Sequence, residues 1–467
     1  MEDRVEDSLA VRKRNYVGLA SSWRQAGIAI VSSSGELVFA EASEACLDRD
    51  AGWDSAQNED LGLAKIIERY CEPDAQIVVA LATNAKQVVC PPAEAGVPRA
   101  LRSAAAYRAC KYQREASMLS GLASTMEYEL QRLHGWPQVG FQRRHFDHHL
   151  THAAAACITG PYAEAVCAVL DGSEERACRC YMYRGGEFFE ISPVRRPPRE
   201  ESLGMLYREV CDACGFRSAL GEQWKVMSLA SYGELDSNMY QAFAAHLTAD
   251  GFSLRFGADR RMPEVDEWIE PLSRIHDDPI MAAANLARTG QAIFEEALYS
   301  LLRNIHGAGI SDNLVLTGGC ALNSSANGGI TANTRFRSVH VPCAPSNEGN
   351  AVGAALLAYR EDNRTMNRRP GFQTPFLGLE VAAKRLGLLI EAGGFSKVQM
   401  CSGDAPQRAA SILAEGKIVG WIQGRAEFGP RALGNRSILA DLTCRLSADQ
   451  SRLRKWLFRD WLWTVFA

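Results

Sequence analysis

Short apolar runs alternate with helix-like segments along most of the chain, and this alternation limits the folds that the chain can adopt. The strand-like runs are residues 16–20, 26–31, 36–40, 75–81, 163–170, 314–317 and 337–341. The short polar loop between the second and third runs predicts a hairpin. Residues 193–310 are predicted to be mostly helical, and residues 281–305 have the longest helical periodicity. This alternation predicts an α/β fold, in which ligands bind at the carboxyl ends of the strands.

The composition is that of a folded protein with two or three domains. The chain has 467 residues, of which 47% are hydrophobic and 23% are charged. Lys and Arg number 51 against 55 Asp and Glu, so the basic excess of a nucleic-acid-binding protein is missing. No signal peptide and no membrane span is recognised, and the 14 cysteines have no disulfide-framework spacing. We therefore expect a cytoplasmic protein without a nucleic-acid or membrane partner.

Three of the nine histidines lie within five residues, directly before an alanine run. Asp147 can cap a helix that begins at His148, since its carboxylate accepts from first-turn N–H groups. His148 and His152 then share one helix face and can bind one transition metal ion if a carboxylate joins them. His149 points elsewhere. The alternative is a capped, histidine-rich surface helix, because two ligands alone do not make a metal site.

Candidate oxygen ligands stand at two other places in the chain. Asp171 follows the strand-like run 163–170 directly, so its carboxylate either reaches into a cleft or belongs to a simple turn. Asn347 and Glu348 precede a helix of small residues, where each could face a metal ion or cap the helix.

Two stretches favour binding of a phosphate or nucleotide. Gly318 and Gly319 follow a strand, and their backbone N–H groups could lie against a phosphate or ribose near Asn323. A polar segment at 360–374 predicts a linker, and beyond it three arginines alternate with glycines. Guanidinium groups match phosphate bidentately, so this loop is predicted to wrap an anion, with an arginine-rich surface loop as the alternative.

Five motifs of the chain belong together. They are His148-His-Leu-Thr-His152, Asp171-Gly172, Glu222-Gln-Trp-Lys225-Val-Met-Ser-Leu-Ala, Gly318-Gly-Cys-Ala-Leu-Asn323 and Gly424-Arg-Ala-Glu-Phe-Gly-Pro-Arg-Ala-Leu-Gly-Asn-Arg-Ser437. In combination they resemble the motifs of the NodU/CmcH family of O-carbamoyltransferases. The resemblance covers about residues 16–441. It implies an actin-like ATPase domain at 1–359, similar to the tRNA threonylcarbamoyl-transfer proteins, a linker at 360–374 and a partial YrdC-like α/β domain at 375–467.

The resemblance also implies the reaction and its participants. In this family the C-terminal domain makes carbamoyl-adenylate from carbamoyl phosphate and ATP, and the larger domain passes the carbamoyl group to a hydroxyl. The acceptor is a sugar or an antibiotic, and a nodulation lipochitooligosaccharide is the first expectation here. The implied metal is Fe²⁺ or another divalent transition metal. The oligomeric state stays open, with a homodimer as one option, and the acidic charge balance disfavours a tRNA-modification enzyme.

The resemblance assigns site residues position by position. The implied metal ligands are His148, His152, Asp171 and Asn347. Lys225 is a catalytic candidate, and Arg24 stands where the family has its catalytic histidine. The implied cofactor-binding residues are Gly318, Gly319, Asn323, Arg425, Arg431, Arg436 and Ser437.

Three departures from the family pattern favour an alternative function. Arg24 cannot act as a base at neutral pH. Asn347 replaces an aspartate ligand, which leaves Glu348 as the nearest carboxylate. The chain ends at Ala467 in an aromatic-rich stretch where the family continues, and a shifted reading frame would produce such an ending. We therefore expect a weakly stable C-terminal domain that cannot make carbamoyl-adenylate alone. The alternative is a degenerate, non-catalytic relative that binds nucleotide or a partner.

Overall fold

A computed structural model of the chain forms two compact units. The first unit is Met1–Ala155 with Asn347–Asn367, and the second unit is Ala156–Ser346 with Arg368–Ala467. The structure describes residues 13–20, 26–42, 63–73, 75–83, 120–121, 123–124, 141–171, 178–191, 202–244, 247–256, 279–363, 373–381, 383–393, 397–399 and 403–440. Arg24, Gly172 and residues 441–467 lie outside these ranges, as does most of the predicted linker. The predicted division into domains at 360–374 therefore stays a prediction.

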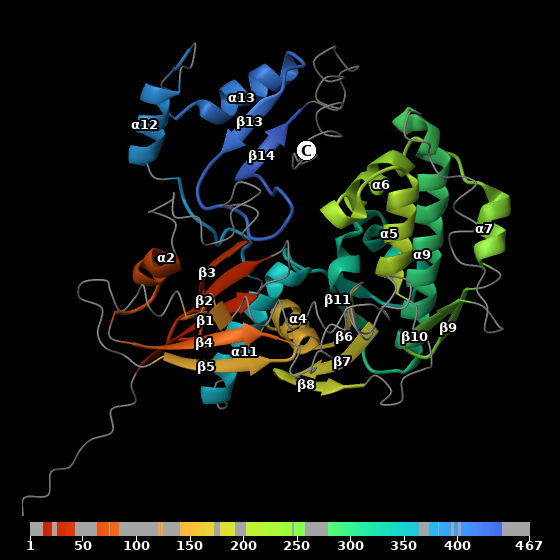
Figure 1. Cartoon of the computed structure of the whole chain (residues 1–467), viewed down its shortest axis with the longest axis horizontal. Helices are drawn as coiled ribbons and strands as arrows, with labels where there is room; N and C mark the ends of the chain where they lie inside the picture. Colours follow the sequence, from red (N-terminus) through yellow and green to blue (C-terminus); the bar gives the residue numbers. More distant parts are fainter. Residues whose placement is uncertain are drawn as a thin grey trace, which may run out of the picture. The chain divides into compact units, whose positions relative to one another are not determined.

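The first unit is built on a five-stranded sheet in the order β3-β2-β1-β4-β5 (Figure 1). Its strands are β1 (Arg14–Ala20), β2 (Gly27–Val31), β3 (Leu37–Ala42), β4 (Gln76–Ala82) and β5 (Phe141–Phe146). Strands β1, β2 and β3 pair antiparallel, whereas β1, β4 and β5 are parallel. The predicted hairpin of the second and third strands is confirmed. The described helical elements of this unit include α2 (Leu63–Tyr70), α4 (His148–Ile158), η6 (Asn347–Gly349) and α11 (Asn350–Asp362). The division between the units falls within α4.

Helix α11 approaches its neighbours so closely that glycine is required at the contacts. A Cβ on Gly18 of β1 would lie 1.8 Å from the carbonyl oxygen of Ala351, and one on Gly27 of β2 would lie 2.4 Å from that of Glu348. A Cβ on Gly353 would lie 1.9 Å from the carbonyl oxygen of Thr151 in α4. Backbone atoms cannot yield at such distances, so α11 is fixed against both the sheet and α4.

The second unit repeats the sheet topology of the first. Its strands are β6 (Glu164–Leu170), β7 (Cys178–Arg184), β8 (Glu187–Glu190), β11 (Asn313–Thr317) and β12 (Ser338–His340), in the order β8-β7-β6-β11-β12. Strands β6, β7 and β8 pair antiparallel, and β6, β11 and β12 are parallel. The predicted α/β class is confirmed, and the repeated topology agrees with the expected actin-like domain.

The remaining core of the second unit is formed by helices around α9 (Ala284–Gly307). This long helix confirms the prediction for 281–305. Its neighbours are α5 (Leu203–Ala213), α6 (Gln223–Ala230), α7 (Ser237–Ala244) and α10 (Ser324–Asn333). The hairpin of β9 (Leu247–Asp250) and β10 (Ser253–Phe256) lies in the region predicted to be mostly helical. Its Asp250-Gly251 turn, with Gly251 at φ +59, is a hairpin signal that the helical interpretation overlooked.

Two helices and one strand pair lie among the described residues of the C-terminal part of the second unit. These are α12 (Ala383–Ala392), α13 (Ala405–Ala414), β13 (Val419–Ile422) and β14 (Arg436–Leu439), with β13 and β14 antiparallel. They do not establish a YrdC-like fold, which stays a prediction. None of the described helices is both long and apolar enough to cross a membrane.

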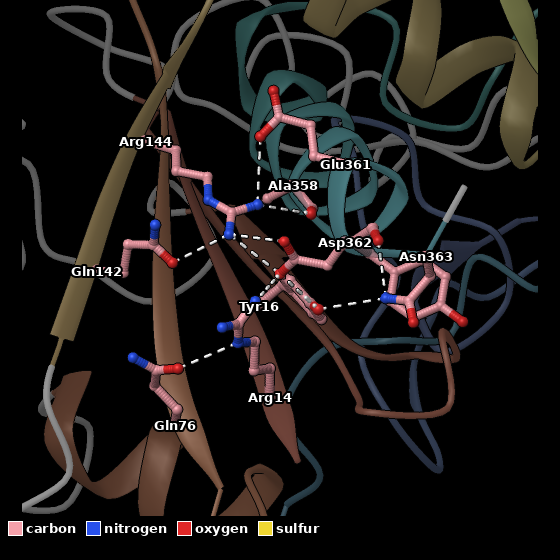
Figure 2. A network of polar contacts seen from close by, with 10 residues as sticks. Arg14, Tyr16, Gln76, Gln142, Arg144, Ala358, Glu361, Asp362 and Asn363 are labelled. Carbon is pink, nitrogen blue, oxygen red and sulfur yellow. Dashed lines mark hydrogen bonds and ion pairs between the residues drawn. The ribbon is translucent and has the colours of Figure 1, made fainter. Parts of the chain in front are cut away.

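The C-terminal end of α11 is held by a network of charged groups in the first unit (Figure 2). Asp362 accepts hydrogen bonds from Arg144 at 2.8 Å and Tyr16 at 3.0 Å, and pairs with Arg14 at 2.9 Å. Burial would raise the pKa of Asp362, but these donors outweigh it and the pKa is lowered. Burial and the hydrogen bond to Asp362 raise the pKa of the Tyr16 phenol to about 12, so Tyr16 remains a donor.

We predict that Asp362→Asn lowers the free energy of unfolding at pH 7 by roughly 1–3 kcal/mol, because it removes charge-assisted bonds. A lowered folded-state pKa gives stability that is present above the unfolded pKa of about 4 and is lost as the pH falls through the folded value. The difference between Asp362→Asn and wild type should therefore shrink in acid. Urea unfolding between pH 7 and 3 measures this. Glu361→Gln is the control, since Glu361 is 52% exposed and should contribute less than about 1 kcal/mol. A pH-independent difference would contradict the prediction.

Candidate functional site

The predicted histidine helix begins where the sequence analysis placed it, directly after β5. The Asp147 carboxylate accepts from the backbone N–H groups of His149 and Leu150, both at 3.0 Å. His148 and His152 lie one turn apart with ring centroids 4.8 Å from each other. His152 is buried and His148 is half-buried. The sequence therefore predicted correctly both the cap and the paired imidazoles.

The start of α11 lies beside this histidine pair in the first unit. The side-chain amide of Asn350 is 3.4 Å from Nδ1 of His148, and Asn350 is 1% exposed. Asn347 is half-buried and Glu348 is buried, both in the short helical turn η6 before α11. The sequence analysis singled out Asn347 and Glu348 but missed Asn350. Asn350 and His148 are 202 positions apart in the sequence, so no local sequence pattern predicts their contact.

The carboxyl edge of the second sheet gathers three of the predicted site residues. Asp171 follows β6, while Gly318 and Gly319 follow β11. Gly318 has φ +92, and a Cβ there would lie 2.3 Å from the carbonyl oxygen of Leu170. At Gly319 a Cβ would meet only the Asp171 carboxylate at 3.7 Å and the Ser346 hydroxyl at 4.0 Å. Gly318 is thus required by packing, whereas a Cβ at Gly319 would lie at ordinary contact distance from two polar side chains.

Asn323, a predicted cofactor-binding residue, belongs to a buried polar network. Its amide pairs with that of Gln291 in both directions at 3.0 Å, and its oxygen also accepts from the N–H of Ala326 as the cap of α10. Gln291 in turn accepts from the Tyr207 hydroxyl at 2.6 Å. Asn323 therefore supports the loop after Gly318 and Gly319 through these bonds.

Lys225, the predicted catalytic lysine, lies in α6 and is buried. Its ammonium contacts Glu222 Oε1 at 2.8 Å, and Glu222 Oε2 accepts from the N–H of Arg217, also at 2.8 Å. Burial would raise the pKa of Glu222, but Lys225 and this N–H lower it. The charged pair joins α6 to the preceding loop, which gives Lys225 a structural partner in addition to any catalytic role.

Residues 424–437, here called the glycine-arginine loop, are organised around Glu427, which the sequence analysis did not single out. Glu427 Oε1 accepts from the N–H groups of Leu433 and Asn435 at 2.7 Å and of Arg436 at 3.0 Å. These bonds lower the pKa of the carboxyl group against the opposing effect of burial. A carboxylate that collects three amides is thus the centre of the loop.

The arginines of this loop have different surroundings. Arg425 donates to the carbonyls of Gly378 and Leu377, and Arg436 donates to those of Gln423 and Gly424. Their guanidinium groups therefore hold the shape of the loop. The Ser437 hydroxyl accepts from the Gly434 N–H at 2.9 Å.

Arg431 reaches out of the loop, and its Nη2 donates to the carbonyl of Leu322 at 2.8 Å. Leu322 ends the turn η5 (Gly319–Leu322), which follows Gly318. Burial lowers the pKa of Arg431. The C-terminal segment thereby brings one partly desolvated guanidinium to the turn after β11.

The sequence agrees with a known family over most of this region. Residues 123–356 match the Carbamoyltransferase N-terminus family and residues 410–457 match the Carbamoyltransferase C-terminus family. The chain belongs to the carbamoyltransferase family. The expected family is thus confirmed, and both histidines, Asp171, the double glycine and the arginine loop all lie within the matched ranges.

Several relatives of this chain are nodulation proteins. Nodulation protein NolNO of Sinorhizobium fredii is 32% identical over 305 residues, which cover 63% of this chain and 42% of that protein. Nodulation protein NolO of Bradyrhizobium diazoefficiens is 32% identical over 307 residues, or 63% and 53% of the two chains. An uncharacterised protein of Synechocystis is 32% identical over 322 residues, or 63% and 50%. The chain spans about half the length of the curated relatives it matches.

We predict that Glu427→Gln loosens the glycine-arginine loop, because the neutral amide weakens three hydrogen bonds to one charged acceptor. Hydrogen exchange at the N–H groups of Leu433, Asn435 and Arg436 should become about 10–100-fold faster, equivalent to roughly 1.5–3 kcal/mol. The control is Glu415→Gln, an exposed glutamate that follows α13, which should leave these three amides unchanged. Equal protection in Glu427→Gln and wild type would show that the loop does not depend on the carboxylate.

Proposed function

We propose that the chain is an O-carbamoyltransferase that moves a carbamoyl group from carbamoyl phosphate, through carbamoyl-adenylate, to a hydroxyl of a sugar-containing acceptor. The observation that carries this proposal is the pair His148 and His152 on one helix face, within a chain of the carbamoyltransferase family. The nodulation proteins among the relatives support a lipochitooligosaccharide as the acceptor. Carbamoyl transfer in antibiotic biosynthesis is the alternative acceptor class.

The donor set fits a divalent transition metal. Two imidazoles at i and i+4 with centroids 4.8 Å apart can direct one nitrogen each to a common ion. Neutral imidazole suits iron, zinc and related metals, and burial of His152 protects such a site from water. We propose Fe²⁺ as the ion, with Asp171 and the amide oxygen of Asn347 completing the ligand set. Asn347 would supply an oxygen but no negative charge.

The proposed reaction joins the acceptor oxygen to the carbamoyl carbon and breaks the bond between that carbon and the phosphate oxygen of AMP. AMP leaves, and the hydroxyl proton passes to a base. A bound divalent metal would supply polarisation of the carbamoyl carbonyl. We propose a phosphate or ribose subsite at the backbone N–H of Gly319, where the turn η5 begins. Arg431 would place positive charge near that subsite, since it is bonded to the end of the same turn.

We predict that the purified chain binds one divalent transition ion and that His152→Ala abolishes this binding. Elemental analysis after dialysis against Fe²⁺ under anaerobic conditions measures the content. His306→Ala is the control, because His306 pairs with Asp312 in the second unit and should not affect the metal. Equal metal content in His152→Ala and wild type would exclude the histidine site.

A degenerate, non-catalytic relative that binds nucleotide or a partner is the second candidate function. Arg24, which lies outside the described residues, stands where the family has its catalytic histidine, and Asn347 replaces an acidic ligand. Both changes remove groups that the proposed transfer would use.

We predict that Arg24→His increases the rate of carbamoyl transfer, by at most the roughly 10²–10⁴-fold that a positioned base contributes. The assay follows the carbamoyl group of carbamoyl phosphate into a chitooligosaccharide acceptor in the presence of ATP. Arg24→Gln is the matched control, since it removes the charge without supplying a base. A gain in Arg24→Gln equal to that in Arg24→His would show that the guanidinium only obstructs.

A further inference from the structure

Asn350 has a buried amide with an incomplete set of hydrogen bonds. Its Nδ2 lies 3.4 Å from Nδ1 of His148, and its side chain is almost fully buried. Its Oδ1 is also buried and has no hydrogen-bond partner among the described residues. A buried amide oxygen without a donor is unfavourable, so this arrangement calls for an explanation.

The two orientations of this amide have opposite consequences for His148. If Nδ2 donates to Nδ1, the ring proton of neutral His148 sits on Nε2 and that nitrogen cannot bind a metal. If the amide is turned by 180°, Oδ1 accepts from Nδ1–H, and the lone pair of Nε2 becomes available. The two orientations have nearly the same shape and occupy the same space. Metal-binding histidines use the second pattern, in which the other ring nitrogen donates to an oxygen.

The backbone around Asn350 is held unusually firmly. The carbonyl of Glu348 lies against Gly27, that of Ala351 against Gly18, and Gly353 lies against the Thr151 carbonyl of α4. These three contacts surround Asn350 in sequence and join its helix to the sheet and to the histidine helix. Close packing of the backbone therefore holds the Asn350 amide in place beside His148.

We propose that Asn350 is a positioning residue whose Oδ1 accepts from Nδ1–H of His148 and so holds the Nε2 lone pair ready for a divalent metal. This role rests on the proposed function, because it presupposes that His148 is a metal ligand. Asn350 itself does not contact the ion. It sets the tautomer and the ring plane of the residue that does.

Two variants separate the acceptor from the shape of the side chain. Asn350→Asp keeps an acceptor oxygen, whereas Asn350→Leu has similar volume and no acceptor. Long-range ¹⁵N–¹H correlation spectra of the metal-free chain, at a pH where the imidazole is neutral, report which nitrogen of His148 carries the proton. We expect Nδ1–H in wild type and Asn350→Asp, and a substantial Nε2–H population in Asn350→Leu. In titrations with Co²⁺ as the probe, we expect Asn350→Leu to bind about 10–100-fold more weakly than wild type. Asn350→Asp should bind Co²⁺ with the wild-type affinity.

The outcomes distinguish this role from the metal site itself. A wild-type chain that binds no Co²⁺ overturns the proposed metal-dependent function. A wild-type chain that binds Co²⁺ while His148 is in the Nε2–H tautomer before loading overturns the role of Asn350 alone. A folded Asn350→Leu variant with unchanged affinity for Co²⁺ also overturns the role of Asn350 alone. If Asn350→Leu fails to fold, the tautomers of wild type and Asn350→Asp still decide the question.

Discussion

The close approach of helix α11 to the first sheet is the constraint on which the candidate site depends. Glycines at positions 18, 27 and 353 allow backbone to touch backbone, and any side chain there would separate α11 from β1, β2 or α4. The charged network around Asp362 holds the other end of the same helix (Figure 2). The C-terminal end of α11 is thereby anchored by charge and its N-terminal end by packing. Asn347 and Glu348 of η6 and Asn350 of α11 lie at the packed end.

In both units the candidate residues follow strand ends, as expected for an α/β fold. His148 comes after β5, Asp171 after β6 and Gly318 after β11. Parallel strands end at a common edge, where side chains and backbone N–H groups that are not used by the sheet can act on a ligand. The repeated topology provides two such edges, and the family match includes His148, Asp171 and Gly318.

The glycine-arginine loop shows how a motif can combine structural and functional demands. Glu427 collects three amides, and Arg425 and Arg436 bind carbonyls of the neighbouring backbone. Arginine is suited to this work because its five donors lie in one rigid plane. Such bonds stiffen the loop, and the partly buried Arg431 extends from it to the turn after Gly318. An arginine-rich motif thus does not imply that every arginine binds an anion.

The sequence by itself determined the α/β class, the histidine helix with its Asp147 cap and the carbamoyltransferase family, because periodicity, capping and motif spacing are local properties of the chain. Only the tertiary structure showed the contact of Asn350 with His148 and the roles of Glu427, Arg425 and Arg436. These depend on which groups the fold brings within hydrogen-bonding distance. A carboxylate or amide has the same appearance in a sequence whether it faces a ligand, an imidazole or three N–H groups, and only packing decides between them.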